Sequence, residues 1–274
     1  MLDSYAVPEI LDENISGSLK ELYDDIKCVL KVPMVNFIFR TLALYESFLS
    51  LGWSQVRPNM LTENMEECSR TLGNPDMSAV VPKINWQHYY DTAQIMNIRK
   101  IVSTFNYANP KLLIIASAWA EALSERPVCG ETTVKGELAP GIQPNLLEIN
   151  LIEYCEAPLS IRGLYEDIAR VHGSFDIASD FRALANFPSF LIESWKHLRP
   201  YVQSDEYEKL KSDIKKLSVK MSHSMPFPVT VSRDNLKQMY NPKDIAGIMG
   251  IVSMFQNFLP GLIIDGEFLR RMLE

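Results

Sequence analysis

The sequence predicts an all-α protein made of two tandem repeats, and three observations support this fold class. A shift of the chain by 142 residues places residues 22–58 on residues 164–200 without a gap and with many identical positions. A second block, residues 101–112, recurs in residues 251–262 at an offset of 150. Apolar residues follow helical spacing, and the alternation typical of strands is nearly absent. We therefore expect two helical repeats of about 130 residues that pack as an intramolecular pseudo-dimer.

The length and composition agree with two halves that together bury a substantial core. The chain has 274 residues, of which 47% are hydrophobic. We predict a first repeat over residues 1–125, a linker over residues 126–158 and a second repeat over residues 159–274. The linker lacks a consistent period and is rich in residues that favour turns, namely Gly130, Gly136, Pro140, Gly141 and Pro144.

The first helix of the first repeat is expected to begin at Ser18, because Ser18 and Glu21 have the spacing of a capping box. It should end near residues 31–32, since the residue before Pro33 is disfavoured in a helix. Its copy in the second repeat spans about residues 160–172. Two further helices per repeat are expected in residues 33–53 and 176–197, with Pro188 marking the break in the second copy.

The remaining helices follow the same order in both repeats. Residues 65–72 and 207–217 have the pattern of charged, amphipathic helices. Two helices hinged at Asn109-Pro110, over residues 91–107 and 111–123, should complete the first repeat. Residues 242–257 and 261–273 are their expected counterparts.

Charge and motif content exclude several function classes. The net charge of −7 and the pI near 5.3 argue against nucleic acid or anionic lipid as a partner. The four cysteines lack CxxC spacing and do not cluster with the four histidines, so we expect no metal site. GxSxG, HExxH, P-loop and GxGxxG motifs are missing, and we expect no cofactor.

The sequence also predicts a cytoplasmic protein that does not enter a membrane. The acidic N-terminus, residues 1–14, does not have the pattern of a signal peptide. The longest strongly apolar stretch, residues 112–120, is much shorter than the roughly 20 residues that a membrane helix requires.

Comparison of the repeats selects two polar residues as candidates for catalysis. Asp180 stands where the first repeat has Ile38, and Asn109 stands where the second has Leu259. A carboxylate in an apolar wall has a raised pKa and becomes a stronger base once it ionises. The structural alternatives are a helix N-cap for Asp180 and a turn residue before proline for Asn109.

Other residues receive weaker assignments. Phe37 and Ser179 occupy equivalent positions before Ile38 and Asp180, so both are expected to line a pocket at the repeat interface. For Phe37, as for Met34 and Phe255, a place in the core is the alternative.

Several charged residues are interpreted as structural. Arg182 recurs as Arg40 and points about 200° away from Asp180 on a helix, so we assign it to the scaffold. Lys111 is a candidate to neutralise a substrate carboxylate, but a lysine at a helix start is usually solvated, so we expect it on the surface. His172 and His223 invite a role as catalytic bases, but no serine or cysteine nucleophile motif accompanies them.

With these motifs in view, the chain resembles the group I 2-haloacid dehalogenases over nearly its whole length. The resemblance rests on Lys31-Val32-Pro33, on the run from Phe105 to Lys111 that contains Asn-Tyr-Ala-Asn-Pro-Lys, on Arg126-Pro127-Val128 and on Ser179-Asp180-Phe181. It implies an all-helical pseudo-dimer with the active site between the repeats, and a homodimer.

The resemblance implies a cofactor-independent hydrolysis of short 2-haloacids of either configuration. In this family an aspartate, matched by Asp180, deprotonates a water that displaces halide at C2 without a covalent ester, and an asparagine, matched by Asn109, holds that water. Met34 and Phe255 depart from the family pattern, which has tryptophan and an aromatic hydroxyl there. We therefore take Met34, Phe37, Ser179 and Phe255 as the substrate-binding candidates.

Three interpretations follow from the sequence. The first is a 2-haloacid dehalogenase in which Asp180 activates water. A mechanistic variant has Asp180 attack carbon directly and form an ester. The alternative from another class is a diverged family member that binds a small ligand or hydrolyses a different small acid, and the departures at Met34 and Phe255 motivate it.

Overall fold

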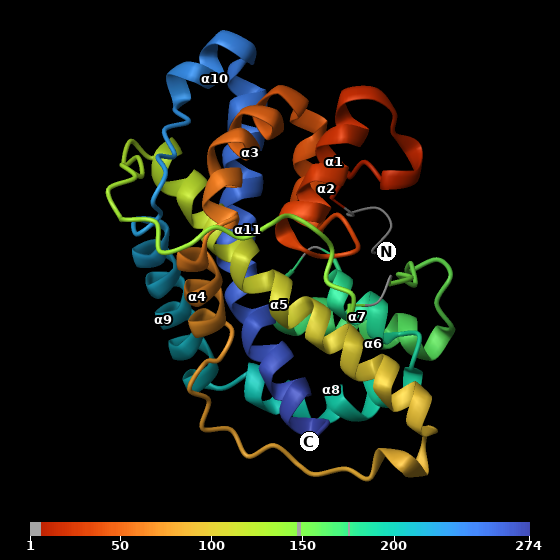
Figure 1. Ribbon diagram of the computed structural model, residues 1–274. Coiled ribbons are helices and arrows are strands. Elements are labelled where there is room, and N and C mark those ends of the chain that lie inside the picture. The colour runs from red at the N-terminus through yellow and green to blue at the C-terminus, as the bar shows by residue number, and fades with distance from the viewer. Residues whose placement is uncertain (1–6, 147–148, 175) are drawn as a thin grey trace.

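The fold is helical throughout the part of the chain that the structure describes, residues 7–146, 149–174 and 176–274 (Figure 1). This computed structural model confirms the predicted all-α class. Residues 1–6 of the predicted first repeat and residues 147–148 of the predicted linker lie outside the described residues. The α-helices are α1 (Gly17–Leu30), α2 (Phe37–Leu42), α3 (Glu46–Met60), α4 (Glu63–Leu72), α5 (Thr92–Leu123), α6 (Leu159–His172), α7 (Ser179–Leu184), α8 (Pro188–Val202), α9 (Asp205–Ser222), α10 (Arg233–Met239) and α11 (Pro242–Met272).

The helices of the two halves follow one another in matching order. The pairs α1 and α6, α2 and α7, and α3 and α8 have equal lengths, and α5 has nearly the length of α11. Both α1 and α6 end at a residue in the left-handed region, Lys31 with φ 64° and Gly173 with φ 63°. The second half has α10 where the first half has a short 3-10 helix, Trp86–His88, and the repeat comparison predicted neither element.

Identical residues of the two repeats make equivalent contacts. Asp25 accepts hydrogen bonds from the Trp53 indole at 2.7 Å and from Arg57 Nε at 2.8 Å. These contacts tie α1 to α3 and hold the pKa of Asp25 below its ordinary value, because they favour its charged form. The same arrangement ties α6 to α8 through Asp167, Trp195 and Arg199.

The predicted start of the first helix was slightly wrong. Helix α1 begins at Gly17 after Ser16, and no side chain caps its N-terminus. Ser18 instead donates a hydrogen bond from Oγ to Glu46 Oε1 at 2.8 Å. The tertiary contact with α3 has replaced the predicted capping box.

The predicted hinges at the two prolines are also wrong. Helix α5 continues through Pro110, and α11 continues through Pro260. A proline inside a helix removes one backbone hydrogen bond and costs about 3 kcal/mol. Burial of both segments offsets this cost, and Gly73 makes room for the proline ring, since a Cβ there would lie 3.0 Å from Pro110 Cγ.

Helices α5 and α11 pack against each other along the centre of the molecule (Figure 1). They approach closely at Gly266, whose carbonyl accepts a hydrogen bond from Asn106 Nδ2 at 3.0 Å. By length and composition α11 is apolar enough to cross a membrane, but it packs within the core against α5 and α9.

Each central helix also contacts the short helix of the opposite half. Helix α5 packs against α7, and α11 packs against α2. The first residues of α2 and α7 therefore face side chains from both repeats. The packing of α5 against α7 brings the candidate catalytic residues, Asn109 and Asp180, close to each other.

Candidate active site

Asp180 lies in the first turn of α7, buried to 9% exposure. The N-cap of this helix is Ala178, and no side chain caps it. Asp180 is therefore not the N-cap that we considered as its structural alternative. A carboxylate in the first turn is favoured by the partial positive charge of the helix N-terminus, while its equivalent in α2, Ile38, is wholly apolar.

Asn109 meets Asp180 across the two halves of the chain. Asn109 Nδ2 donates a hydrogen bond to Asp180 Oδ2 at 2.8 Å, and both side chains are buried. Asn109 lies in the middle of α5 rather than in a turn, so the turn alternative for this residue is also wrong. Its equivalent, Leu259, shows that the helix forms without an amide at this position.

Burial raises the pKa of Asp180 from 3.8 to about 7, and the hydrogen bond from Asn109 partly opposes this rise. Most of the residues that line the chamber around this carboxyl are apolar and do not solvate its charged form. Near neutral pH it is partly ionised, and in that state it is a stronger base than an exposed aspartate. This is the range in which a general base is most effective.

Asp180 and Asn109 both line a small chamber between α2, α5, α7 and α11. Its volume is about 30 Å³, which is close to the share of one water molecule in liquid water. The substrate-binding candidates Met34, Phe37, Ser179 and Phe255 line the same chamber. The structure thus brings together all six predicted site residues, although their roles remain predictions.

Three buried polar atoms of the chamber lining lack a hydrogen-bond partner within the described part of the chain. They are Ser179 Oγ, Asn36 Oδ1 and Arg40 Nη2. An unpaired buried polar group costs about 1–3 kcal/mol, so such groups mark places where a ligand or water binds. Asn36 and Arg40 were not among the site residues predicted from the sequence.

The repeat comparison that selected Asp180 and Asn109 could also have selected Asn36, because this polar residue stands where the second repeat has Ala178. Arg40 carries no such signal, since arginine stands at both equivalent positions. Only the neighbours of the two arginines distinguish them.

Of the two charged residues Arg182 and Lys111, only Arg182 lies where the sequence predicted. Arg182 forms ion pairs with Glu153 and Asp176 outside the chamber, as its assignment to the scaffold predicts. Lys111 is buried at 1% exposure rather than on the surface, because Glu66 at 2.7 Å and the Tyr107 hydroxyl at 2.6 Å receive its ammonium group. It does not line the chamber.

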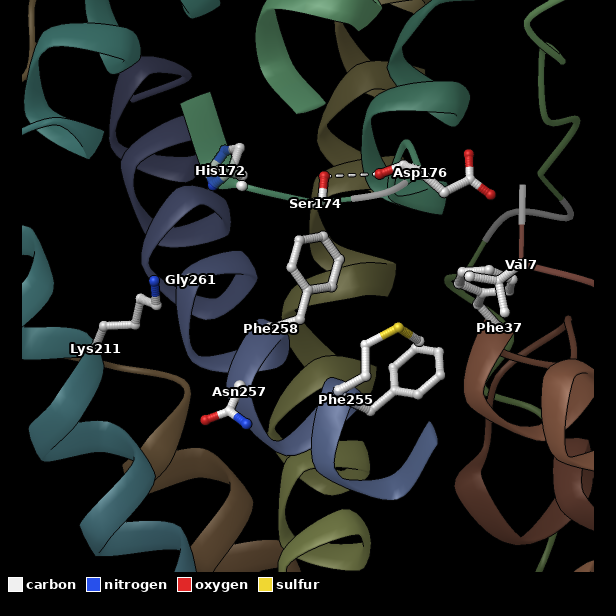
Figure 2. A pocket seen from close by; sticks show the side chains of 12 residues that line it. Val7, Phe37, His172, Ser174, Asp176, Lys211, Phe255, Asn257, Phe258 and Gly261 are labelled. Atoms are coloured by element: carbon white, nitrogen blue, oxygen red, sulfur yellow. Dashed lines mark hydrogen bonds between the residues drawn. The ribbon is translucent and has the colours of Figure 1, made fainter. Parts of the chain in front are cut away.

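A larger cavity of about 240 Å³ adjoins the chamber (Figure 2). The two share Phe37, Phe255 and Phe258 as lining residues, so these rings separate them. Phe37 and Phe255 pack edge to face with centroids 5.4 Å apart. Phe258 has no such ring contact within the described residues, and Figure 2 shows its ring standing between Ser174 and Phe255.

A second buried polar cluster lies beside this outer cavity. Tyr207 donates a hydrogen bond to Asp265 Oδ1 at 2.9 Å, and His172 Nε2 lies 3.3 Å from Asp265 Oδ2. Burial raises the pKa of Asp265 well above its usual range and lowers that of His172 to about 4. Near neutral pH we therefore expect a protonated Asp265 and a neutral His172. The equivalent residues of the first repeat are all apolar and buried: Leu30, Met65 and Ile115.

Tyr207 and Asp265 lie outside the most similar segments of the two repeats, whereas His172 lies within them and was set aside because no nucleophile motif accompanies it. When the alignment of the repeats is extended along α9 and α11, Tyr207 and Asp265 also stand opposite apolar residues of the first repeat, Met65 and Ile115. Within the described residues, no group of three His, Cys, Asp or Glu side chains is placed to hold a metal ion.

Curated proteins of similar sequence have one chemistry in common. The chain is 28% identical over 269 residues to the "2-haloacid dehalogenase, configuration-inverting" of Alcaligenes xylosoxydans xylosoxydans, covering 94% of this chain and 90% of that protein. It is 27% identical over 260 residues to the "(R)-2-haloacid dehalogenase" of Pseudomonas putida, covering 90% of this chain and 86% of that protein.

Solved structures show the same fold. A crystal structure described as that of a D-2-halacid dehalogenase mutant superposes with a TM-score of 0.92 at 24% identity, covering 98% of this chain and 96% of that chain. The family model "Halocarboxylic acid dehydrogenase DehI" matches residues 33–180, a segment that contains both Asn109 and Asp180. Because this match covers more than half of the sequence, the chain belongs to the DehI family.

Proposed function

We propose that this protein hydrolyses the carbon–halogen bond of short 2-haloacids. The observation that carries the proposal is the hydrogen-bonded pair of Asp180 and Asn109 in a small, largely apolar chamber. The name of the family contains the word dehydrogenase, whereas the curated relatives are named dehalogenases. A buried carboxylate beside space for one water supports hydrolysis.

In the proposed reaction the Asp180 carboxylate takes a proton from water while the water oxygen attacks C2 of the substrate. The electron pair of the carbon–halogen bond leaves with the halide, and the product is a 2-hydroxyacid. Asp180 then releases the proton to solvent and returns to its charged form. With a pKa of about 7, Asp180 is suited to both steps near neutral pH.

Asn109 has the position to orient the attacking water. Its Nδ2 group holds one oxygen of Asp180, and an amide also offers an acceptor oxygen. When the water and the base are held in one geometry, the reaction avoids the entropic cost of bringing them together. Apolar walls exclude competing water, so that the oriented molecule reacts.

The chamber has room for about one water, so the substrate needs additional space. Phe258 separates the chamber from the 240 Å³ cavity and lacks the ring contacts that hold Phe37 and Phe255 together. Displacement of the Phe258 ring supplies this space in our proposal.

The stereochemical outcome tests the displacement. Each pure enantiomer of 2-chloropropionate is incubated with the enzyme, and the lactate formed is resolved by chiral chromatography. Attack at C2 opposite the halide predicts inverted lactate from every enantiomer that reacts. Retained or racemic lactate contradicts a single displacement at C2.

Inversion alone does not separate direct hydrolysis from an ester of Asp180, because the ester also forms by attack at C2. A single turnover in ¹⁸O-water makes the distinction. Direct attack by water predicts label in lactate and none in Asp180. Label in the carboxyl of Asp180 would establish the ester instead.

A further inference from the structure

Arg40 and Arg182 occupy equivalent positions of the two repeats, and each contacts a backbone carbonyl and a glutamate. Arg40 Nη1 donates to the Val35 carbonyl at 2.7 Å, and Arg182 Nε donates to the equivalent carbonyl of Ile177 at 3.0 Å. Each also pairs with a glutamate, Arg40 with Glu9 at 2.6 Å. These contacts fix both guanidinium groups against their own short helices, α2 and α7.

The two arginines use different nitrogens for these contacts, and only Arg182 has a further acceptor. Arg182 Nη2 donates to Asp176 Oδ2 at 3.2 Å. In the first repeat Met34 occupies the position of Asp176, and a thioether does not replace a carboxylate as an acceptor. Arg40 Nη2 consequently has no hydrogen-bond partner within the described residues, although Arg40 is only 6% exposed.

The unpaired nitrogen belongs to a residue that lines the catalytic chamber. Arg40, Met34 and Asp180 are all part of its lining, whereas Arg182 is not. Ser179 Oγ, a second unpaired group of the lining, is also able to donate a hydrogen bond. The lining that contains the base therefore also contains two donors without acceptors, one of them charged.

This arrangement fits the carboxylate of a 2-haloacid. Guanidinium groups bind carboxylates strongly, and hydrogen bonds between charged groups are about twice as strong as neutral ones. Glu9 is bound by Arg40 Nε and lies 3.7 Å from Arg182, so it neutralises part of the charge and leaves Nη2 free. The centroid of the Phe37 ring lies 5.7 Å from each guanidinium carbon, so the ring packs against both arginines.

We propose that Arg40 binds the carboxylate of the substrate through Nη2, and that Met34 determines this specificity by leaving Nη2 without an internal acceptor. The inference rests on the proposed function, since it names how that site recognises an acid. It also explains why the first repeat differs from the second at position 34 while both keep the arginine.

The test introduces the residue of the second repeat. Met34→Asp should supply Arg40 Nη2 with a carboxylate, as Asp176 does for Arg182, and so compete with the substrate. We compare kcat/KM for 2-chloropropionate with that for 2-chloropropionamide, its uncharged analogue, at pH 9, where Asp180 stays ionised. The preference for the acid should fall about 10-fold or more, which corresponds to the loss of one charged hydrogen bond, and the change should lie in KM.

Three further variants make the result specific. Val80→Asp adds the same charge at a residue that is 94% exposed, and it should leave the preference unchanged. Met34→Leu alters the chamber wall without a charge and should affect acid and amide by similar factors. Arg40→Lys retains a positive charge for Glu9 but loses the second nitrogen, so it should reduce the preference as Met34→Asp does.

A binding measurement separates this inference from the proposed function. Calorimetry with propionate, which has no leaving group, should show about 10-fold weaker binding to Met34→Asp than to Val80→Asp. If wild type releases no halide, the proposed function fails, and propionate binding still decides the role of Arg40. Equal acid preference, or equal propionate affinity, in folded Met34→Asp and Val80→Asp proteins would overturn the inference.

Discussion

Asn109 donates a hydrogen bond to Asp180 at 2.8 Å, and the two residues are 71 positions apart in the sequence. The bond connects the centre of α5 to the first turn of α7, so it depends on the packing of one repeat against the short helix of the other. It also opposes the effect of burial on Asp180, whose pKa is nevertheless raised to about 7.

The pH dependence of activity should report this bond. We expect kcat/KM to rise with pH through about 7, as Asp180 ionises. Asn109→Leu, which introduces the residue of the second repeat, removes a hydrogen bond that favours the charged form. The midpoint of the profile should therefore move to higher pH, and kcat at high pH should fall about 100-fold because the water is no longer oriented. An unchanged midpoint would show that the bond does not control the base.

Stability should respond to pH through the same carboxyl. The pKa of Asp180 is about 7 in the folded protein against 3.8 in an unfolded chain. The folded state thus holds its proton more tightly, and its advantage is complete below pH 3.8 and lost as pH rises through 7. Asp180→Asn should stabilise the protein at pH 8 relative to wild type, by an amount on the order of 4 kcal/mol.

Urea unfolding of both proteins at pH 5 and pH 8 measures this effect. The difference between them should be larger at pH 8, where wild type has a charged Asp180. A difference that does not depend on pH would mean that the carboxyl is better solvated than its burial indicates.

The cluster beside the outer cavity should tolerate an amide in place of its acid. Asp265 Oδ1 accepts a hydrogen bond from Tyr207, and the amide oxygen of asparagine is able to accept the same bond without a charge. We expect Asp265→Asn to change the free energy of unfolding by less than about 1 kcal/mol. Asp265→Leu removes the acceptor of the buried Tyr207 hydroxyl and should cost about 1–3 kcal/mol. Similar losses from both substitutions in thermal unfolding would indicate a charged Asp265.

The size of the substrate should be controlled by Phe258. Phe258→Ala introduces the residue found at the equivalent position, Ala108, and joins the chamber to the cavity of about 240 Å³. The ratio of kcat/KM for 2-chlorohexanoate to that for 2-chloropropionate should rise about 10-fold or more, since each accommodated methylene is worth about 1–3 kcal/mol. Phe258→Trp should change the ratio in the opposite direction. No change in either variant would exclude this ring as the partition that yields to substrate.

The all-α class and the candidate catalytic pair were predictable from the sequence for related reasons. Helical periodicity is a local signal and survives in nearly every element. Asp180 and Asn109 stood out because each has an apolar counterpart in the other repeat, so the fold itself does not require them. The same reasoning extends to Asn36 and Asp265.

Other features depend on tertiary contacts that no local pattern contains. Pro110 and Pro260 predicted breaks, but packing of α5 against α11 keeps both helices continuous. Lys111 is buried because Glu66 approaches it from α4 and Tyr107 from the preceding turn of α5. The free nitrogen of Arg40 follows from the identity of a different residue, Met34, and becomes visible only when the contacts of both arginines are compared.

Halide release by wild type and by Asp180→Asn tests the central claim most directly. Both proteins are incubated with racemic 2-chloropropionate at pH 9, with Asp234→Asn, whose side chain is 83% exposed, as the matched control. Asparagine keeps the shape and removes the base, so release should fall at least about 100-fold while the control equals wild type. Equal release by Asp180→Asn and wild type would contradict the account.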